Sequence, residues 1–271
     1  PIEQGRVPGG LCPYASLLSS RGRYYTYLGA YFIEFDPKSR QFTAVEPGPP
    51  RVAMAMTEDD EGQIWAVTYP DCAVARYDPK TRQCRSYGCV HEHSSEQYPR
   101  YIAADDRGWI YVGVGLAAGQ IIIVNPQTGQ TETVIPDAEI VGEGRVEVHR
   151  DLNGRVYGVA PTPDGKQWYE CYDGQARKLD EAPTIEHRPI LSGSQRLRHR
   201  DLPNGERVRK LDLKNGRMIV EDPASGDARQ FQIDTGAEGG AAMGVAFVPD
   251  GTLAGGTYIP HQFFNYDPDS D

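Results

Sequence analysis

Two turn markers recur in step along the chain, and this repeat constrains the fold more than any other feature of the sequence. In the copy from Thr57 to Gln83, turns at Gly62 and at Asp78-Pro79 bracket a pair of short strand-like runs. Asp-Pro suits a type I turn, because Pro pre-sets φ and Asp can cap the turn backbone. The first marker recurs as Gly22, Gly62, Gly108, Gly154, Gly205 and Gly251, and the second as Asp36-Pro37, Asp78-Pro79, Asn125-Pro126, Asp173-Gly174, Asp222-Pro223 and Asp267-Pro268. A period in the forties with four short strands per copy is typical of a β-propeller blade.

We therefore predict an all-β chain of four-stranded antiparallel blades, with six repeats in one propeller domain over residues 1–271. The predicted blades cover residues 12–46, 51–87, 100–135, 145–179, 189–233 and 241–271. The sixth repeat stops before its fourth strand. A propeller must close its ring to remove exposed strand edges. Either residues 1–8 supply the missing strand or the natural chain continues, with a seventh blade in the continuation. Two prolines in those eight residues favour a chain truncated at its C-terminus.

Charge and cysteine content narrow the class of partner. The formal net charge is −10, which argues against binding to nucleic acid or to an anionic membrane, because both require a basic face. No apolar run approaches a membrane-spanning length, and the chain as given has no signal peptide. The five cysteines are odd in number and irregularly spaced, so we expect free thiols, although Cys84 and Cys89 could pair.

Four arginines recur at the start of the first strand of successive blades. They are Arg51, Arg100, Arg145 and Arg188. First strands line the central channel of a propeller, and varied loops on one face of a rigid frame commonly carry function. Convergent guanidiniums are costly unless an anion or carboxylates pair with them. The sequence therefore predicts an anionic small molecule or oligosaccharide as ligand. The structural alternative is pairing with nearby Glu96, Glu143 or Glu186.

The loop from Gly88 to Pro99 supplies candidate catalytic groups. His91 and His93 alternate, so both imidazoles point the same way in an extended segment. They could hold a divalent metal, or one could act as a general base with Tyr98 as the acid. A solvated polar loop is the structural alternative. His187, beside Arg188, is a further candidate base.

Loops between the second and third strands add three residues to the same predicted face. Tyr69, Tyr258 and His261 are predicted to contact substrate, and loop packing is the alternative for each of them.

The tetrapeptides beginning at His149 and His199 both read His-Arg-Asp-Leu, as at the start of a protein-kinase catalytic loop. The other kinase motifs are missing. Both copies are in register with the first turn of a blade, so we interpret them as turn chemistry.

The repeats resemble those of bacterial lyase-type propellers. The repeat DDEGQIWAVTYPDCAVARYDPKTRQ and its copy DDRGWIYVGVGLAAGQIIIVNPQTGQ are most similar to streptogramin B lyase-like repeats. The architecture is shared with oligogalacturonate and ulvan lyases, which cleave uronate sugars by β-elimination. The resemblance implies a carbon–oxygen lyase, secreted or periplasmic, in which Arg100 and Arg145 neutralise the developing enolate. A non-catalytic ligand- or protein-binding propeller is the main alternative. A streptogramin lyase-like enzyme or a calcium-dependent lactonase-type enzyme is a further one.

Overall fold

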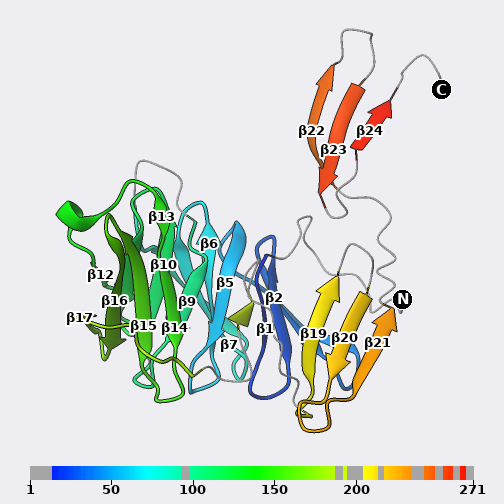
Figure 1. The fold of residues 1–271 in the computed structure, drawn as a ribbon, viewed down its shortest axis with the longest axis horizontal. Helices are drawn as coiled ribbons and strands as arrows, with labels where there is room; N and C mark the ends of the chain where they lie inside the picture. The colour runs from blue at the N-terminus through cyan, green and yellow to red at the C-terminus, as the bar shows by residue number, and fades with distance from the viewer. Residues whose placement is uncertain are drawn as a thin grey trace. The chain divides into compact units, whose positions relative to one another are not determined.

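A computed structural model describes residues 14–92, 98–186, 192–193, 204–212, 217–232, 241–247, 253–258 and 263–266. The chain divides into two compact units, one within residues 4–199 and the other within residues 200–271. We describe each unit by itself (Figure 1).

The first unit contains four antiparallel blades, in each of which four strands pair in chain order, and two of these sheets have a fifth strand. These sheets confirm the predicted all-β blades of a propeller. The strands are β1 Ser16–Leu18, β2 Tyr24–Leu28, β3 Tyr31–Asp36 and β4 Gln41–Pro47; β5 Val52–Glu58, β6 Ile64–Tyr69, β7 Ala73–Asp78 and β8 Gln83–Cys89; β9 Tyr101–Ala104, β10 Ile110–Leu116, β11 Gln120–Val124 and β12 Thr131–Thr133; β14 Glu147–Arg150, β15 Val156–Thr162, β16 Gly165–Tyr172 and β17 Gln175–Leu179. A 3₁₀ turn, Asp137–Glu139, and a two-residue strand, β13 Gly144–Arg145, connect the third blade to the fourth.

The first turn marker has the same geometry in every blade where the structure describes it. Gly22, Gly62, Gly108, Gly154 and Gly205 have φ between 71° and 89°, a left-handed conformation that costs little only for glycine. In blades two and three the turn is held by a carboxylate that accepts two backbone N–H groups of the same turn. Asp59 accepts from Glu61 and Gln63, and Asp105 accepts from Arg107 and Trp109, at 2.9–3.0 Å.

The second turn marker is likewise a side-chain-capped turn. The Oδ1 of Asp36, Asp78, Asn125 or Asp222 accepts the backbone N–H two residues later at 2.8–2.9 Å. The backbone N–H four residues after each marker donates to its carbonyl at 2.8 Å. Residues at that fourth position have positive φ, and they are Arg40, Arg82, Gly129 and Gly226. Local turn chemistry therefore repeats where the sequence predicted it.

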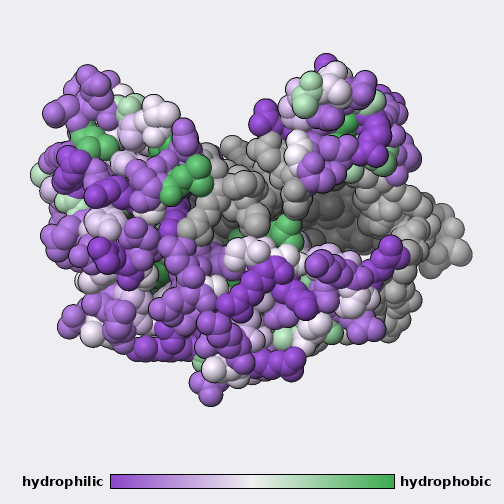
Figure 2. All heavy atoms as spheres, turned by 90° about the horizontal axis from the view of Figure 1, so that it is seen from below, coloured by the Kyte–Doolittle hydropathy of each residue, from purple (hydrophilic) through white to green (hydrophobic). Residues whose placement is uncertain are grey.

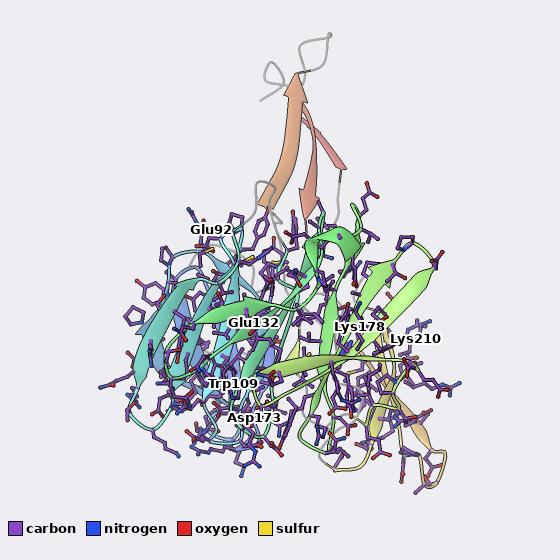
Figure 3. The ribbon with its side chains drawn as sticks, turned by 90° about the vertical axis from the view of Figure 1, so that its left-hand side faces the viewer. Glu92, Trp109, Glu132, Asp173, Lys178 and Lys210 are labelled. Atoms are coloured by element: carbon purple, nitrogen blue, oxygen red, sulfur yellow. The ribbon has the colours of Figure 1, made fainter. Side chains whose placement is uncertain are left out.

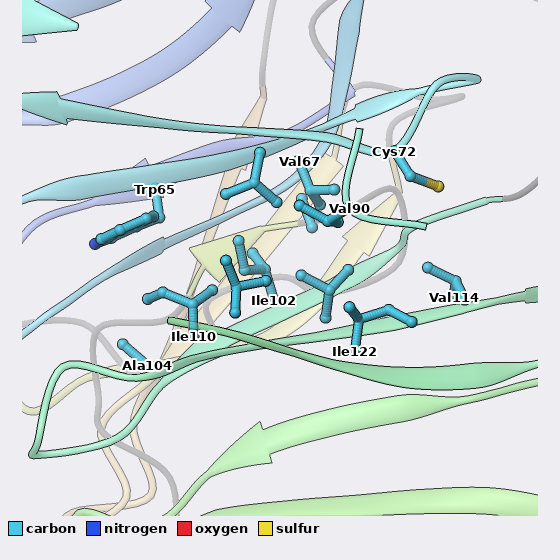
Figure 4. Packing of buried hydrophobic residues seen from close by; sticks show 13 residues of the cluster. Trp65, Val67, Cys72, Val90, Ile102, Ala104, Ile110, Val114 and Ile122 are labelled. Atoms are coloured by element: carbon cyan, nitrogen blue, oxygen red, sulfur yellow. The ribbon is translucent and has the colours of Figure 1, made fainter. Parts of the chain in front are cut away.

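Consecutive blades of the first unit pack face to face. Their first strands β1, β5, β9 and β14 lie side by side, as Figure 1 shows. Three apolar clusters fill the three junctions between blades. The junction of blades two and three contains Trp65, Val67, Ile102, Ile110 and Ile122, all at most 4% exposed (Figure 4). This arrangement positions the ends of neighbouring first strands next to each other.

The turn-marker ends of blades three and four interlock. The backbone N–H of Asp173 donates to Asp105 Oδ2 at 2.7 Å, and that of Gly174 donates to the hydroxyl of Tyr111 at 3.0 Å. A Cβ added at Gly174 would lie 2.6 Å from the Trp109 ring. Trp109 and Asp173 accordingly lie at the same end of the sheets (Figure 3). Both turn markers therefore lie on one face at this junction.

The second unit contains two three-stranded antiparallel sheets among the residues that the structure describes. One comprises β19 Arg207–Asp212, β20 Arg217–Glu221 and β21 Ala228–Gln232, and the other β22 Ala241–Phe247, β23 Leu253–Tyr258 and β24 Phe263–Tyr266. The prediction for the fifth blade differs from the structure in the placement of residues 192–193. Ser192–Gly193, placed by the sequence in that blade, form β18 and pair with β1 of the first blade. The inner edge of a first strand has unpaired N–H and C=O groups, so it can accept such a pairing.

The described surface is largely hydrophilic in the view of Figure 2. No helix in the described part of the chain is long and apolar enough to cross a membrane. Cys72, Cys84, Cys89 and Cys171 are free thiols, as predicted. The alternative pairing of Cys84 with Cys89 is wrong, because both lie on the extended strand β8 at opposite ends, too far apart for a disulfide.

Candidate functional site

Three polar side chains line one side of the segment formed by β13 and the inner strand of blade four, β14; Arg145 belongs to β13, and Glu147 and His149 belong to β14. Arg145, Glu147 and His149 alternate with Val146 and Val148, which are 1% and 3% exposed in the junction with blade three. Successive side chains of a strand point to opposite sides, so the arginine, the carboxylate and the imidazole share the other side. The side chains of His149 and Glu147 are 19% and 35% exposed.

Tyr101 at the start of β9 completes this cluster. Its hydroxyl lies close enough to Arg145 and Glu147 for both side chains to act on its pKa, which the arginine lowers and the carboxylate raises. The imidazole Nε2 of His149 lies 3.1 Å from Glu147 Oε2. The rings of Tyr101 and His149 meet edge to face at 5.5 Å. Arginine, phenol, carboxylate and imidazole therefore form one connected network.

Burial and the network move two pKa values of this cluster in opposite directions. The hydrogen bond from His149 lowers the pKa of Glu147, with help from Tyr101 and from the charge of Arg145. Burial, and then the negative charge of Glu147, raise the pKa of Tyr101. Glu147 is therefore a carboxylate at neutral pH and Tyr101 a neutral phenol. If Nε2 of a neutral His149 carries the proton, it donates to Glu147 and Nδ1 is the basic nitrogen.

Three residues predicted from the sequence come together beside this network. The rings of Tyr69 and Tyr98 stack at 4.4 Å, and their hydroxyl oxygens lie 3.2 Å apart. The guanidinium carbon of Arg100 lies 5.0 Å from the centre of the Tyr98 ring. Tyr69 ends the second strand of blade two, while Tyr98 and Arg100 precede the first strand of blade three. The stack Arg100–Tyr98–Tyr69 therefore spans the junction between the two blades.

The network and the stack meet around the end of β10. The backbone N–H of Tyr98 donates to the carbonyl of Gly115 at 3.2 Å, and Gly115 also pairs with Arg145. A Cβ at Gly115 would lie 2.4 Å from the carbonyl oxygen of Gly144. This close approach requires glycine and brings the two groups together. Arg100 and Tyr101 are consecutive in the chain, so one segment contributes a residue to each group.

None of the contacts in the described part of the chain brings the remaining predicted site residues into the network or the stack. Arg51 is exposed immediately before β5, with φ of 125°. His91 is partly buried directly after Val90, which belongs to the core between blades two and three. Only the backbone of Tyr258 is described, at the end of β23. Four further predicted residues lie outside the described residues: His93, His187, Arg188 and His261.

The register of the arginines differs from the sequence-based alignment. Counted from the turn aspartate of each blade, Arg51 precedes Asp59 by eight residues, Arg100 precedes Asp105 by five and Arg145 precedes Asp151 by six. A bulge in β5 accounts for one residue of this difference. The equivalence of the four arginines stays a prediction. Among the three in described segments, Arg145 pairs with Gly115, and Arg100 lies two residues after Tyr98, whose N–H donates to Gly115.

Glu147, His149 and Tyr101 were missed as site residues by the sequence reasoning. The alternation Arg-Val-Glu-Val-His was a usable signal, because a strand with period two puts its polar residues on one side. The motif around His149 was interpreted as turn chemistry. The structure confirms this for Asp151, whose backbone closes the turn at Gly154, whereas His149 lies in β14 beside Glu147.

Metal ligation has no evident basis in the described part of the chain. No three His, Cys, Asp or Glu side chains gather there in a way that could hold a metal ion.

Comparison with known proteins gives structural likenesses at low sequence identity. No protein-family model and no curated protein sequence matches the chain. The chain is similar to a streptogramin B lyase structure (14% identity, TM-score 0.45, 89% of this chain and 74% of that one). It is also similar to virginiamycin B lyase from Staphylococcus aureus (11%, TM-score 0.47, 96% and 85%) and to Kuenenia stuttgartiensis hydrazine synthase (14%, TM-score 0.47, 99% and 81%). Any function must be argued from the site itself.

Proposed function

We propose that this chain is a carbohydrate-active lyase that cleaves an anionic, uronate-containing oligosaccharide by β-elimination. The observation that carries the proposal is the network of Arg145, Tyr101, Glu147 and His149 beside Arg100. It combines a base held by a carboxylate, a neutral phenol and the guanidinium of Arg145, and Arg100 precedes the phenol in the chain. Elimination beside a carboxylate requires these same three kinds of group.

In this proposal His149 removes the proton from the sugar carbon that bears the carboxylate. The electron pair left on that carbon forms a double bond to the neighbouring carbon, and the glycosidic carbon–oxygen bond breaks. Tyr101 protonates the leaving oxygen and recovers its proton from solvent. Arg100 and Arg145 neutralise the enolate charge that develops on the carboxylate. No oxidant and no water molecule is consumed in the cleavage step.

The roles follow from the electrostatics of each group. The raised pKa of Tyr101 keeps its proton available at neutral pH. Glu147 holds the imidazole in one orientation and, as an anion, stabilises the imidazolium that forms during the reaction. His91 and His93 remain candidate bases, as the loop prediction had them, and Tyr98 is assigned to the stack with Arg100.

The test is incubation with a panel of uronate polysaccharides and oligosaccharides, followed by the ultraviolet absorbance of the unsaturated product. We expect product from at least one hexuronate polymer, and loss of product by His149→Gln with the fold retained. Binding of the panel without any product would contradict the lyase and leave a non-catalytic anion-binding propeller. That second function is favoured because Arg145, Tyr101 and Glu147 already interact electrostatically with one another.

A further inference from the structure

A small cavity lies between blades two and three at their turn-marker end. Its volume is about 120 Å³, below the range of about 300–1,000 Å³ that is typical of cavities for drug-sized ligands. Blade two lines it with Trp65, Arg76 and acidic residues of its first turn, and blade three lines it with Asp106 and Arg107 among others. No described residue of the proposed active site lines this cavity, so it is a separate feature of the molecule.

Arg76 brings to this cavity a guanidinium that has no polar partner in the described part of the chain. It lies in β7, paired with Trp65 of β6, and its guanidinium carbon is 5.7 Å from the centre of the Trp65 ring. No hydrogen bond and no ion pair joins Arg76 to another described residue. The side chain is half-buried. A guanidinium partly withdrawn from water without an acceptor is unfavourable, because charged groups lose most when a hydrogen bond is unmade.

A second arginine increases the positive charge around Arg76. Arg85 lies directly opposite Arg76 in the antiparallel pairing of β7 with β8, and like charges in that position destabilise a sheet. Arg85 has partners of its own. Its guanidinium donates to the carbonyl of Gln127 at 2.8 Å and lies 4.6 Å from the centre of the Tyr87 ring. An anionic group bound to Arg76 would therefore supply the missing acceptor and also reduce the repulsion between the two arginines.

Four carboxylates line the same cavity, and two of them have strong partners within the protein. Asp59 Oδ2 accepts the indole N–H of Trp65 at 2.7 Å. Asp60 Oδ2 accepts a hydrogen bond from the guanidinium of Arg150 at 2.7 Å. Both of these carboxylates are therefore engaged by blades two and four.

The other two carboxylates, Glu61 and Asp106, are exposed and have weaker contacts. Glu61 Oε2 accepts a hydrogen bond from the side chain of Gln63 at 3.2 Å. Asp106 Oδ1 lies 3.9 Å from Arg107 Nε, and exposed ion pairs of this kind contribute little. Neither carboxylate forms an ion pair with Arg76, although all three side chains line one small space. A ligand that fits this space must match charges of both signs.

We propose that this cavity binds a small zwitterion, an α-amino acid with a short side chain. The carboxylate of the amino acid pairs with Arg76, since a guanidinium can donate two parallel N–H···O bonds to a carboxylate. Its ammonium group donates to Glu61 and Asp106. A simple anion would meet the carboxylates of the cavity, and a simple cation would meet Arg76. The site is independent of the proposed lyase activity, because it shares no residue with it.

The experiment compares alanine with acetate and methylammonium, which each have one of its two charged groups. Calorimetry of the full chain at low ionic strength measures the three affinities, because salt screens such contacts. We expect alanine to bind at least about tenfold more tightly than either fragment, since it makes both charge-assisted contacts at once. Alanine should also raise the melting temperature, because it binds the folded chain. Acetate binding as tightly as alanine, or no binding of alanine, would overturn the proposal.

Substitutions locate the binding within the cavity. Arg76→Gln should weaken alanine binding about tenfold to a hundredfold, as expected for lost charged hydrogen bonds, and Arg76→Lys should weaken it less because the charge remains. Glu61→Gln and Asp106→Asn should each weaken alanine binding about twofold to tenfold without weakening that of acetate. Lys80→Gln removes an exposed charge from the second turn of the same blade. It is the matched control and should leave the affinity for alanine unchanged.

Each result decides for or against the site. Circular dichroism and the melting temperature without ligand establish that each variant is folded. An unchanged affinity for alanine in folded Arg76→Gln would contradict the site, and so would equal losses in Arg76→Gln and Lys80→Gln, which would reflect net charge alone. If Arg76→Gln does not fold, Arg76→Lys and Asp106→Asn decide the question, because full affinity in both would place alanine elsewhere.

Discussion

Replacing Asp105 with Ala should destabilise the first unit more than any change at an exposed aspartate. The residue is 0% exposed. Its Oδ1 accepts the backbone N–H groups of Arg107 and Trp109, and its Oδ2 accepts the Tyr111 hydroxyl at 2.9 Å and the Asp173 N–H at 2.7 Å. One side chain thus closes a turn and joins two blades.

The magnitude follows from the donors that lose their acceptor. The Tyr111 hydroxyl and the Asp173 N–H lie in the interlocked junction of blades three and four, and each unsatisfied buried donor costs about 1–3 kcal/mol. Burial raises the pKa of the Asp105 carboxyl, so removing the buried charge returns part of that cost. We expect a net loss of about 2–4 kcal/mol in the free energy of unfolding, and a fall in melting temperature of about 4–15 °C.

Asp105→Asn is the sharper variant. The amide keeps one oxygen for the two turn N–H groups, but its NH₂ faces the Asp173 N–H, so one donor opposes another. The Tyr111 hydroxyl can turn to accept. We expect a loss of about 1–3 kcal/mol. Asp164→Asn, in the exposed turn before β16, is the matched control and should change stability by less than about 0.5 kcal/mol.

The assay is urea denaturation followed by tryptophan fluorescence and circular dichroism, with thermal melts as a second measurement. Trp109, whose backbone N–H donates to Asp105, reports on the affected turn. A midpoint for Asp105→Ala indistinguishable from that of Asp164→Asn would refute the reasoning, since the interlocked donors would then have found other partners at no cost.

Three further experiments, two with substitutions and one with a thiol reagent, test other parts of the structure. The pKa of Glu147 is lowered in the folded protein, so its contribution to stability is present above its unfolded pKa and is lost as pH falls through the folded value. Glu147→Gln should therefore flatten the acid side of the stability profile between about pH 6 and about pH 3. Urea titration at a series of pH values measures this effect. Gly174→Ala, with a Cβ 2.6 Å from Trp109 and φ of 72°, should cost at least about 1 kcal/mol in a thermal melt. A thiol reagent should label the exposed Cys89 in the folded protein and the buried Cys171 only after denaturation; rapid labelling of both in native buffer would contradict the core assignment.

The turn markers show what the sequence alone determined. Each marker acts over four or five consecutive residues, through a glycine with positive φ or through an Asp or Asn that accepts the backbone N–H two residues later. Interactions of that range depend on local residues only. The spacing of the markers along the sequence therefore predicted the blades and the positions of their turns. The alternation around Glu147 is equally local, and it would have predicted the polar row of blade four.

Contacts between blades required the tertiary structure. Tyr69 and Tyr98 are 29 residues apart and stack only because blade two packs on blade three. The effect of Glu147 on the pKa of Tyr101 likewise depends on β9 lying beside β14. The pairing of β18 with β1 joins segments that the repeat had assigned to different blades. A repeat specifies each blade from local residues, whereas the packing of neighbouring blades decides which side chains from separate blades meet.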